Sequence, residues 1–186
     1  MKQFLWPSIK LTLLSLLLLS GVYTLILLGV AQLAPGKGKG ELIAWKGKTY
    51  YANIGQSFTD DRYFWSRPSA VGYNASGSGG SNKGPNNPEY LQTVKDRIDS
   101  FLVHNPDIGR AQIPVDLVTA SGSGLDPDIS LQAAKVQAPR IARLRGIPET
   151  SLLALIDKQT EQPLLGLFGP AKLNVLRLNM ALDNLK

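Results

Sequence analysis

The sequence predicts an α+β fold: a single N-terminal transmembrane helix followed by one mixed α/β domain. Three observations lead to this prediction. No charged residue interrupts residues 11–36, whereas the rest of the chain is polar and rich in glycine and proline. In that second part, apolar residues recur at helical spacing in several segments, and two short runs favour strands. With 186 residues, the chain is long enough for one domain and an anchor.

A helix over residues 11–34 would cross a bilayer, because about 20 apolar residues span its hydrocarbon core. Residues 1–10, with Lys2 and Lys10, then form a short N-terminal tail. A cleaved secretory signal is the competing interpretation, but the apolar run is too long and lacks a clean small-residue cleavage site. We therefore expect an uncleaved anchor in the lipid bilayer. The flanking charges leave the side of the domain open.

The first elements after the anchor follow from local signals. Residues 35–40 are expected to be a linker, because glycine and proline end the helix, and residues 41–186 form the domain. Two β-prone runs around Lys46 and Gly47 predict a hairpin. Residues 56–88 are rich in Gly, Ser, Asn and Pro and predict a long loop, which in a compact domain is usually functional or disordered.

Helix signals dominate the second half of the chain. Asn87 and Pro88 predict the start of an amphipathic helix that ends at His104, the only histidine, where a cation suits the C-terminal end of the helix dipole. Ser130 is expected to cap a further helix, with Asp126 and Asp128 near its positive end.

Proline and asparagine mark the remaining boundaries. Pro139 should kink or break the helix that begins after Ser130, before residues 140–145. A helix over residues 149–160 would bury Leu152, Leu155 and Ile156. Two strands are then expected around Gly169 and Pro170, and Asn179 is expected to cap a last short helix.

Few kinds of chemistry fit this composition. The chain has no cysteine, which excludes disulfides and thiolate metal sites, and its acidic residues are too dispersed to predict a metal ion. No G-x-S-x-G elbow and no complete phosphate-binding P-loop occurs, so we predict no catalytic residue. The formal net charge is +6, but the Lys and Arg residues form no basic stripe, so no nucleic acid is expected as a partner.

The pentapeptide ASGSG occurs twice, at residues 75–79 and 120–124. Glycine-rich segments that lead into a helix can bind phosphate through backbone N–H groups. Asp126 and Asp128 follow the second copy, however, and would repel an anion. We interpret the two copies as unrelated turns, the first in an exposed loop that is open to a partner and the second at a helix start.

An aromatic segment, YFWSRPSA, precedes the first copy. Its members Tyr63, Phe64, Trp65 and Arg67 fit two roles equally well. Aromatic clusters usually lie in a core, but aromatic residues with arginine are also typical of binding hot spots. The residues are therefore predicted either to fill the core or to dock a partner.

These segments together resemble a known family. YFWSRPSA, ASGSGGSN, PVDLVTASGSGLDPDIS, QAAKVQAPRIARLRG and QPLLGLFGPAKLNVLRLNMALD, in this order and over nearly the full chain, resemble the C subunit of the Kdp-type potassium-transporting P-type ATPase. The resemblance implies a non-catalytic accessory subunit in a bacterial plasma-membrane complex for high-affinity potassium uptake. Its implied partners are a potassium-selecting membrane subunit, an ATP-hydrolysing subunit and a small single-span subunit.

The resemblance also implies an ATP-related role as a catalytic chaperone that raises the ATP affinity of the catalytic subunit. By matching position, the implied nucleotide contacts are Ser121, Gly122, Ser123, Gly124 and Asp126, with Gln132 or Gln137. No tightly bound cofactor is expected, and ATP would reach the chain through the complex.

Family topology implies a single-pass protein with a cytoplasmic N-terminus and an extracytoplasmic main domain. This topology conflicts with direct ATP contact, because ATP is cytoplasmic, and we therefore favour a structural role for the second ASGSG. The alternative function is a stand-alone membrane-tethered extracytoplasmic enzyme or ligand-binding protein.

Overall fold

The computed structural model describes residues 2–34 and 36–185. Met1, Pro35 and Lys186, which fall in the expected tail, linker and domain, lie outside the described residues. The chain divides into two compact units, Met1–Ile43 and Ala44–Lys186, each of which is described by itself.

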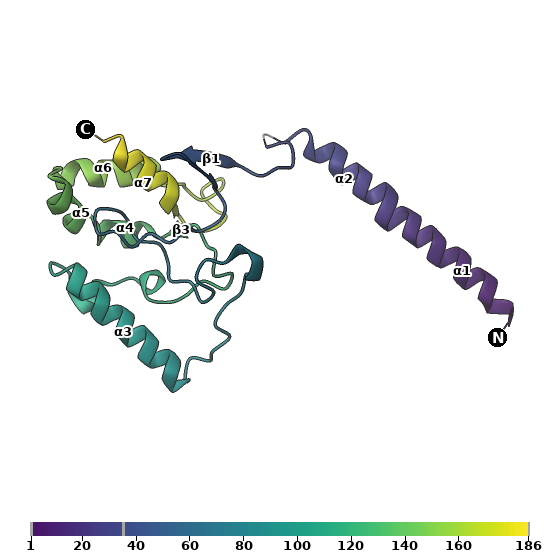
Figure 1. The fold of residues 1–186 in the computed structure, drawn as a ribbon, viewed down its shortest axis with the longest axis horizontal. Coiled ribbons are helices and arrows are strands. Elements are labelled where there is room, and N and C mark those ends of the chain that lie inside the picture. Colours follow the sequence, from purple (N-terminus) through teal and green to yellow (C-terminus); the bar gives the residue numbers. More distant parts are fainter. Residues whose placement is uncertain (1, 35, 186) are drawn as a thin grey trace. The chain divides into compact units, whose positions relative to one another are not determined.

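The first unit is a long apolar helix (Figure 1). It consists of α1 (Lys2–Leu16), a π-helical segment (Leu17–Val22) and α2 (Tyr23–Ala31). The helix therefore begins at Lys2 and includes most of the ten residues expected to form a tail. Phe4, Leu5 and Trp6 continue the apolar sequence, and Pro7 interrupts the backbone hydrogen bonds only locally. Residues Gln3–Ala31 are long and apolar enough to span a membrane.

The expected hairpin is made by β1 (Leu42–Trp45) and β2 (Lys48–Tyr51), and most of it belongs to the second unit. Lys46 and Gly47 both have positive φ, 49° and 74°, which is the backbone geometry of the tight turns that match the twist of paired strands. The following residues, 52–87, are irregular except for a 3-10 turn at Ala75–Gly77. The long loop predicted from composition is thus present.

The helices of the domain also follow the predicted signals. The helix α3 (Pro88–His104) starts where Asn87 accepts a hydrogen bond from the Tyr90 backbone N–H at 3.0 Å. Two 3-10 turns, Arg110–Gln112 and Val115–Leu117, follow it. Ser130 caps α4 (Leu131–Lys135) by accepting a hydrogen bond from the Ala133 N–H.

Pro139 separates α4 from α5 (Ala138–Arg145), because it lies in the first turn of the new helix, where no backbone N–H is needed. The helix α6 (Glu149–Gln159) buries Leu152, Leu155 and Ile156 as predicted.

The C-terminal part differs from the prediction in two ways. Residues 161–172 form a turn with only two isolated bridges, Glu161 to Lys172 and Leu164 to Phe168, and the two-residue strand β4 (Leu173–Asn174) pairs antiparallel with β3 (Asp128–Ile129). Asn174, and not Asn179, caps the last helix α7 (Val175–Asp183). Positive φ at Leu165, Gly166 and Gly169 interrupts the expected strands. The last helix begins about one turn earlier than predicted, after Asn174.

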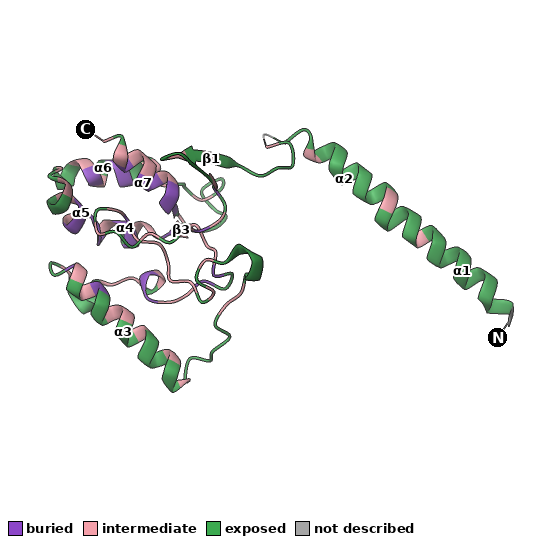
Figure 2. Ribbon diagram, viewed as in Figure 1, coloured by how far each residue is buried: buried purple, intermediate pink, exposed green. Residues whose placement is uncertain are grey.

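The core lies among α4, α5, α6, α7 and one side of α3 (Figure 2). Alanines on α4 and α5 allow close packing of these helices, and leucine and isoleucine from α6 and α7 fill the space between them. The fully buried apolar side chains include Phe64, Ile141, Leu152, Ile156, Leu173, Leu178 and Leu182. This packed core fixes the loops that carry the predicted site residues.

Candidate functional site

The two ASGSG copies lie against each other. We call residues 75–80 the first glycine loop and residues 120–126 the second glycine loop. The Gly79 N–H donates a hydrogen bond to the Ser123 carbonyl at 2.8 Å, and the Ser78 hydroxyl donates to the same carbonyl at 3.0 Å. The interpretation of the copies as unrelated turns is therefore wrong. Their shared composition permits the close approach of two backbones, which local sequence patterns do not reveal.

Gly124 is the most constrained glycine at this junction. Its φ is +66°, and a Cβ placed there would lie 2.6 Å from Val71 Cγ2 and 2.8 Å from the Gly79 carbonyl oxygen. The Ser69 hydroxyl donates a hydrogen bond to the Gly124 carbonyl at 2.7 Å. A side chain at Gly124 would therefore push the two loops apart. The close packing of the loops explains why glycine occupies this position.

A third segment, around Gly55, also contacts the second glycine loop. The Gly55 N–H donates to the Leu125 carbonyl at 2.7 Å, and a Cβ on Gly55 would lie 2.5 Å from the Asp126 carbonyl oxygen. Three segments distant in the sequence thus meet at the second glycine loop. The carbonyls of Ser123, Gly124 and Leu125 are consequently all used inside the domain.

The carboxylates beside this loop are paired with cations. Arg67 Nη1 lies 2.7 Å from Asp126 Oδ2, and Lys172 Nζ lies 2.6 Å from Asp128 Oδ2. The hydrogen bond with Asp128 raises the pKa of Lys172 above its ordinary value. Asp116, rather than Asp126 or Asp128, accepts the Ser130 N–H at the start of α4.

A cleft of about 450 Å³ lies beside these pairs, with both cations and all three carboxylates in its wall. Because three carboxylates face only two cations, the cleft lacks the excess of positive charge that would attract a polyphosphate. Within residues 2–34 and 36–185, no three His, Cys, Asp or Glu side chains are grouped to hold a metal ion.

The predicted nucleotide contacts are only partly brought together. Ser121, Gly122, Ser123, Gly124 and Asp126 share the second glycine loop, and Ser121 and Gly124 are buried in it. Gln132 is exposed on α4. Gln137 is fully buried: its Oε1 accepts from the Trp65 N–H and from Arg140, both at 2.8 Å, and its Nε2 donates to the Ala133 carbonyl. The Gln137 amide thus already has internal partners.

The aromatic segment is a central part of the domain. Phe64 has no exposed surface, and its backbone N–H and carbonyl both bond the amide of buried Asn179, at 2.9 and 3.0 Å. Tyr63 is half-buried and donates its hydroxyl to Asp183 at 2.8 Å. The core role is therefore evident for Phe64, whereas partner docking by this segment stays a prediction.

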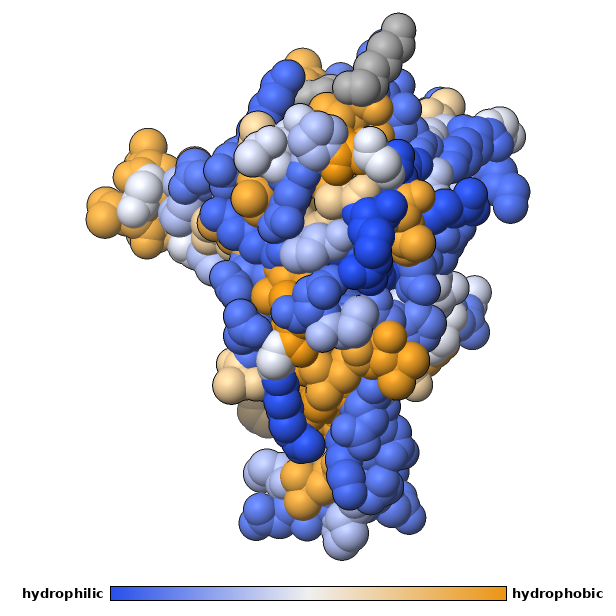
Figure 3. All heavy atoms as spheres, turned by 90° about the vertical axis from the view of Figure 1, so that its left-hand side faces the viewer, coloured by the Kyte–Doolittle hydropathy of each residue, from blue (hydrophilic) through white to orange (hydrophobic). Residues whose placement is uncertain are grey.

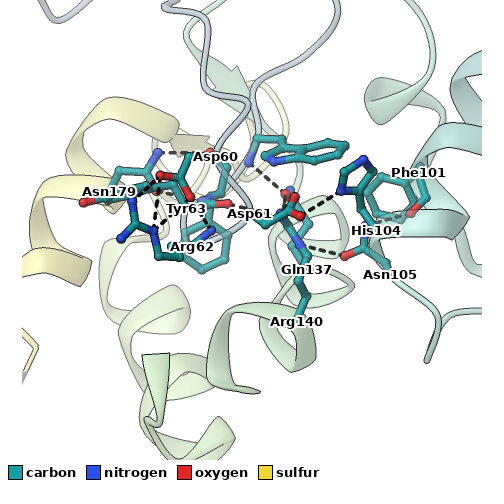
Figure 4. A network of polar contacts seen from close by, with 12 residues as sticks. Asp60, Asp61, Arg62, Tyr63, Phe101, His104, Asn105, Gln137, Arg140 and Asn179 are labelled. Carbon is teal, nitrogen blue, oxygen red and sulfur yellow. Dashed lines mark hydrogen bonds and ion pairs between the residues drawn. The ribbon is translucent and has the colours of Figure 1, made fainter. Parts of the chain in front are cut away.

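Buried Arg140 organises the polar network next to this segment (Figure 4). Its side chain is 1% exposed, and its guanidinium donates to Asp61 and Asn105 at 3.0 Å, to Gln137 at 2.8 Å and to the Tyr63 carbonyl at 3.2 Å. Burial lowers the pKa of Arg140, and the Asp61 carboxylate opposes this effect. The network ties α5 to residues 61–65 and to the end of α3.

His104, at the end of α3, joins the same network. Its Nδ1 lies 2.8 Å from Asp61 Oδ2, and its ring lies 4.9 Å from the Trp65 ring. The Trp65 ring also faces the Arg140 guanidinium, 4.7 Å away. Asp61 was not predicted as a site residue, and Asn179 was expected only as a helix cap; the buried contacts of Arg140 and Asn179 were not predicted. For Arg140 and Asn179, the available signal was a polar residue among apolar neighbours on a helix.

The comparisons with known proteins agree with this description. The family model of KdpC, the c chain of the K+-transporting ATPase, matches residues 5–184. The potassium-transporting ATPase KdpC subunit of Bacteroides thetaiotaomicron is 51% identical over 186 residues and covers 98% of both chains. That of Bacteroides fragilis is 50% identical over 183 residues and covers 96% of both.

A more distant relative gives the same result. The potassium-transporting ATPase KdpC subunit of Caldanaerobacter subterraneus is 46% identical over 177 residues, which covers 94% of this chain and 92% of the relative. The family predicted from the ordered motifs is therefore confirmed. This chain belongs to the KdpC family, the c chain of the K+-transporting ATPase.

Proposed function

We propose that this chain, an accessory and non-catalytic subunit of the K+-transporting ATPase, stabilises the assembled complex from the outer side of the bacterial plasma membrane. The observation that carries the proposal is the family match over residues 5–184, which includes both the apolar helix and the domain. The rival function, a stand-alone tethered enzyme or ligand-binding protein, has no support in the comparisons.

Three partners belong to the proposal: a potassium-selecting membrane subunit, an ATP-hydrolysing subunit and a small single-span subunit. The apolar helix would lie beside them in the bilayer, with a cytoplasmic N-terminus and an extracytoplasmic domain. Its exposed apolar side chains all around the axis suit contact with lipid and with other membrane helices. Tyr63, Trp65 and Arg67, which are partly exposed, are proposed to contribute to docking.

Any effect of this subunit on ATP affinity is proposed to pass through the assembly. The internal hydrogen bonds of the second glycine loop and of Gln137, and the carboxylates Asp126 and Asp128, support a structural role for this region. The full chain alone should therefore give no fluorescence change with a trinitrophenyl ATP analogue. A saturable change that Ser123→Ala removes would instead assign direct nucleotide contact.

Co-purification tests the proposed function. An affinity tag on this chain, co-expressed with the other subunits, should recover a complex with K+-stimulated ATPase activity, whereas the chain alone should hydrolyse no ATP. Recovery of the chain without the other subunits, or ATP hydrolysis by the chain alone, would contradict the proposal.

The aromatic segment is tested in the same assay. Trp65→Ala should reduce recovery of the potassium-selecting subunit, with Trp65→Phe as the control that keeps an aromatic ring near Arg140. The melting temperature of each variant separates loss of docking from loss of folding. Normal recovery with a folded Trp65→Ala variant would remove this residue from the docking surface.

A further inference from the structure

A group of large apolar side chains is exposed at the turn between α6 and β4. We call residues 163–170 the apolar tip. Leu164, Leu165, Leu167 and Phe168 are 69%, 81%, 81% and 64% exposed, and no charged residue occurs between Glu161 and Lys172. On the face drawn in Figure 3, hydrophilic side chains predominate and apolar atoms lie in patches between them. Elsewhere in the described part of the domain, residues 44–185, the large exposed apolar side chains are scattered singly, so four neighbouring ones on one turn are unusual.

The backbone of the apolar tip has a defined conformation. Leu164 and Phe168 exchange two backbone hydrogen bonds, at 3.1 and 3.0 Å, and the Gly166 N–H donates to the Pro163 carbonyl at 2.9 Å. At the base of the turn, Glu161 and Lys172 exchange a second pair, at 2.9 and 3.1 Å. The next residue, Leu173, is fully buried in the core, so the tip projects from a fixed base.

Leu165 adds a conformational cost to this arrangement. Its φ is +55°, in the left-handed region that leucine rarely adopts, and Gly166 and Gly169 also have positive φ, 71° and 85°. Such strain persists only where the surrounding structure enforces it, and it is common at binding sites. The turn thus holds its leucines outward instead of letting them fold onto the domain.

The apolar tip fits a protein cleft better than a membrane surface. It contains no Trp or Tyr, which are typical of side chains at the bilayer interface. The next cation along the chain, Lys172, is already paired with Asp128 at 2.6 Å and lies 3.6 Å from Glu161, so it is not placed to attract anionic lipid headgroups. A preformed apolar projection is, in contrast, what a partner's pocket can bind with little loss of conformational freedom.

We infer that the apolar tip inserts into an apolar cleft of another subunit of the K+-transporting ATPase. This inference rests on the proposed function, because it requires the chain to be assembled with the other subunits. It assigns the main docking contact to Leu164, Leu165, Leu167 and Phe168, outside the aromatic segment.

The absence of native cysteine allows a direct test. Leu167→Cys places a thiol on the tip, and Val103→Cys places a matched thiol on α3, at a side chain that is 78% exposed. Each full-length variant is reconstituted alone in vesicles of phosphatidylethanolamine and phosphatidylglycerol, and separately purified in the complete complex. The rate of reaction with a polar maleimide is then measured in both states.

The expected result is that the two thiols react at similar rates in the chain alone, and that only the thiol at position 167 slows in the complex, by about tenfold or more. Slowing in the chain alone would assign the tip to the lipid surface and overturn the inference. Equal rates in the complex would leave the tip in solvent and overturn it as well.

Recovery of the complex separates this inference from the proposed function. If the unmodified chain recovers no other subunit, the proposed function fails and the inference fails with it. If the complex is recovered but the thiol at position 167 stays reactive, only the inference fails. As a second measurement, Leu167→Asp should lower recovery of the complex about tenfold, while Val103→Asp should leave it unchanged. Unchanged recovery with Leu167→Asp would contradict docking by the tip.

Discussion

Replacing Gly124 by alanine should destabilise the folded domain by about 3 kcal/mol, because two costs add at this position. A left-handed residue other than glycine costs about 1–2 kcal/mol, and an extra carbon forced into a packed site costs about 1–3 kcal/mol. Both apply here, since φ is +66° and the new Cβ would lie 2.6 Å from Val71 Cγ2 and 2.8 Å from the Gly79 carbonyl oxygen. For a domain of this size the melting temperature should fall by about 6–12 °C.

The second glycine loop supplies its own control. Gly122 does not have positive φ, and a Cβ added there would meet no atom within 4 Å. Gly122→Ala should therefore change the free energy of unfolding by less than about 0.5 kcal/mol. Thermal unfolding of the full chain in detergent, followed by tryptophan fluorescence, measures both variants. Equal melting temperatures for Gly124→Ala and Gly122→Ala would refute the conclusion that the two glycine loops are packed together.

Three further predictions concern buried and charged groups. Arg140→Met should lower the free energy of unfolding, measured by chemical denaturation, by about 3–5 kcal/mol, because it leaves buried polar partners unpaired. Arg143→Met breaks only an exposed ion pair and should lower it by less than about 1 kcal/mol. Asn179→Ala should lower the free energy of unfolding by about 2–4 kcal/mol, because it leaves the buried N–H and carbonyl of Phe64 unpaired. A melting temperature unchanged from the parent chain would contradict that role. The hydrogen bonds from Arg62 lower the pKa of Asp60 to about 2, so its stabilising contribution is present above about pH 4 and is lost as the pH falls toward 2. Asp60 is exposed, so in Asp60→Asn the fall in melting temperature between about pH 4 and about pH 2 should become only slightly shallower, and a steeper fall would contradict the assignment.

The sequence predicted those elements whose causes are local. The hairpin around Lys46 and Gly47, the start of α3 at Asn87 and the break at Pro139 each depend on residues within one or two turns of the backbone. The start of α7 was misplaced because Asn174 and Asn179 are both good capping residues, and only the pairing of β3 with β4 selects the first.

The site depended on contacts that no local pattern contains. Arg140 and Asp61 are 79 residues apart in the chain, and Asn179 and Phe64 are 115 residues apart. The contact between the two glycine loops is of the same kind, because either copy alone has the composition of an ordinary turn. Ordered motifs nevertheless identified the family, since family membership is a property of the whole sequence and does not require these contacts.

The side of the membrane on which the domain lies is measured directly with a single cysteine at Ser81, which is exposed beyond the first glycine loop. Intact cells are treated with a membrane-impermeant maleimide, with permeabilised cells and a Gln3→Cys variant as controls. An accessory subunit with an outward domain predicts labelling at position 81 in intact cells and labelling at position 3 only after permeabilisation. Labelling at position 81 only after permeabilisation would contradict an extracytoplasmic domain and would return the second glycine loop to consideration as a nucleotide site.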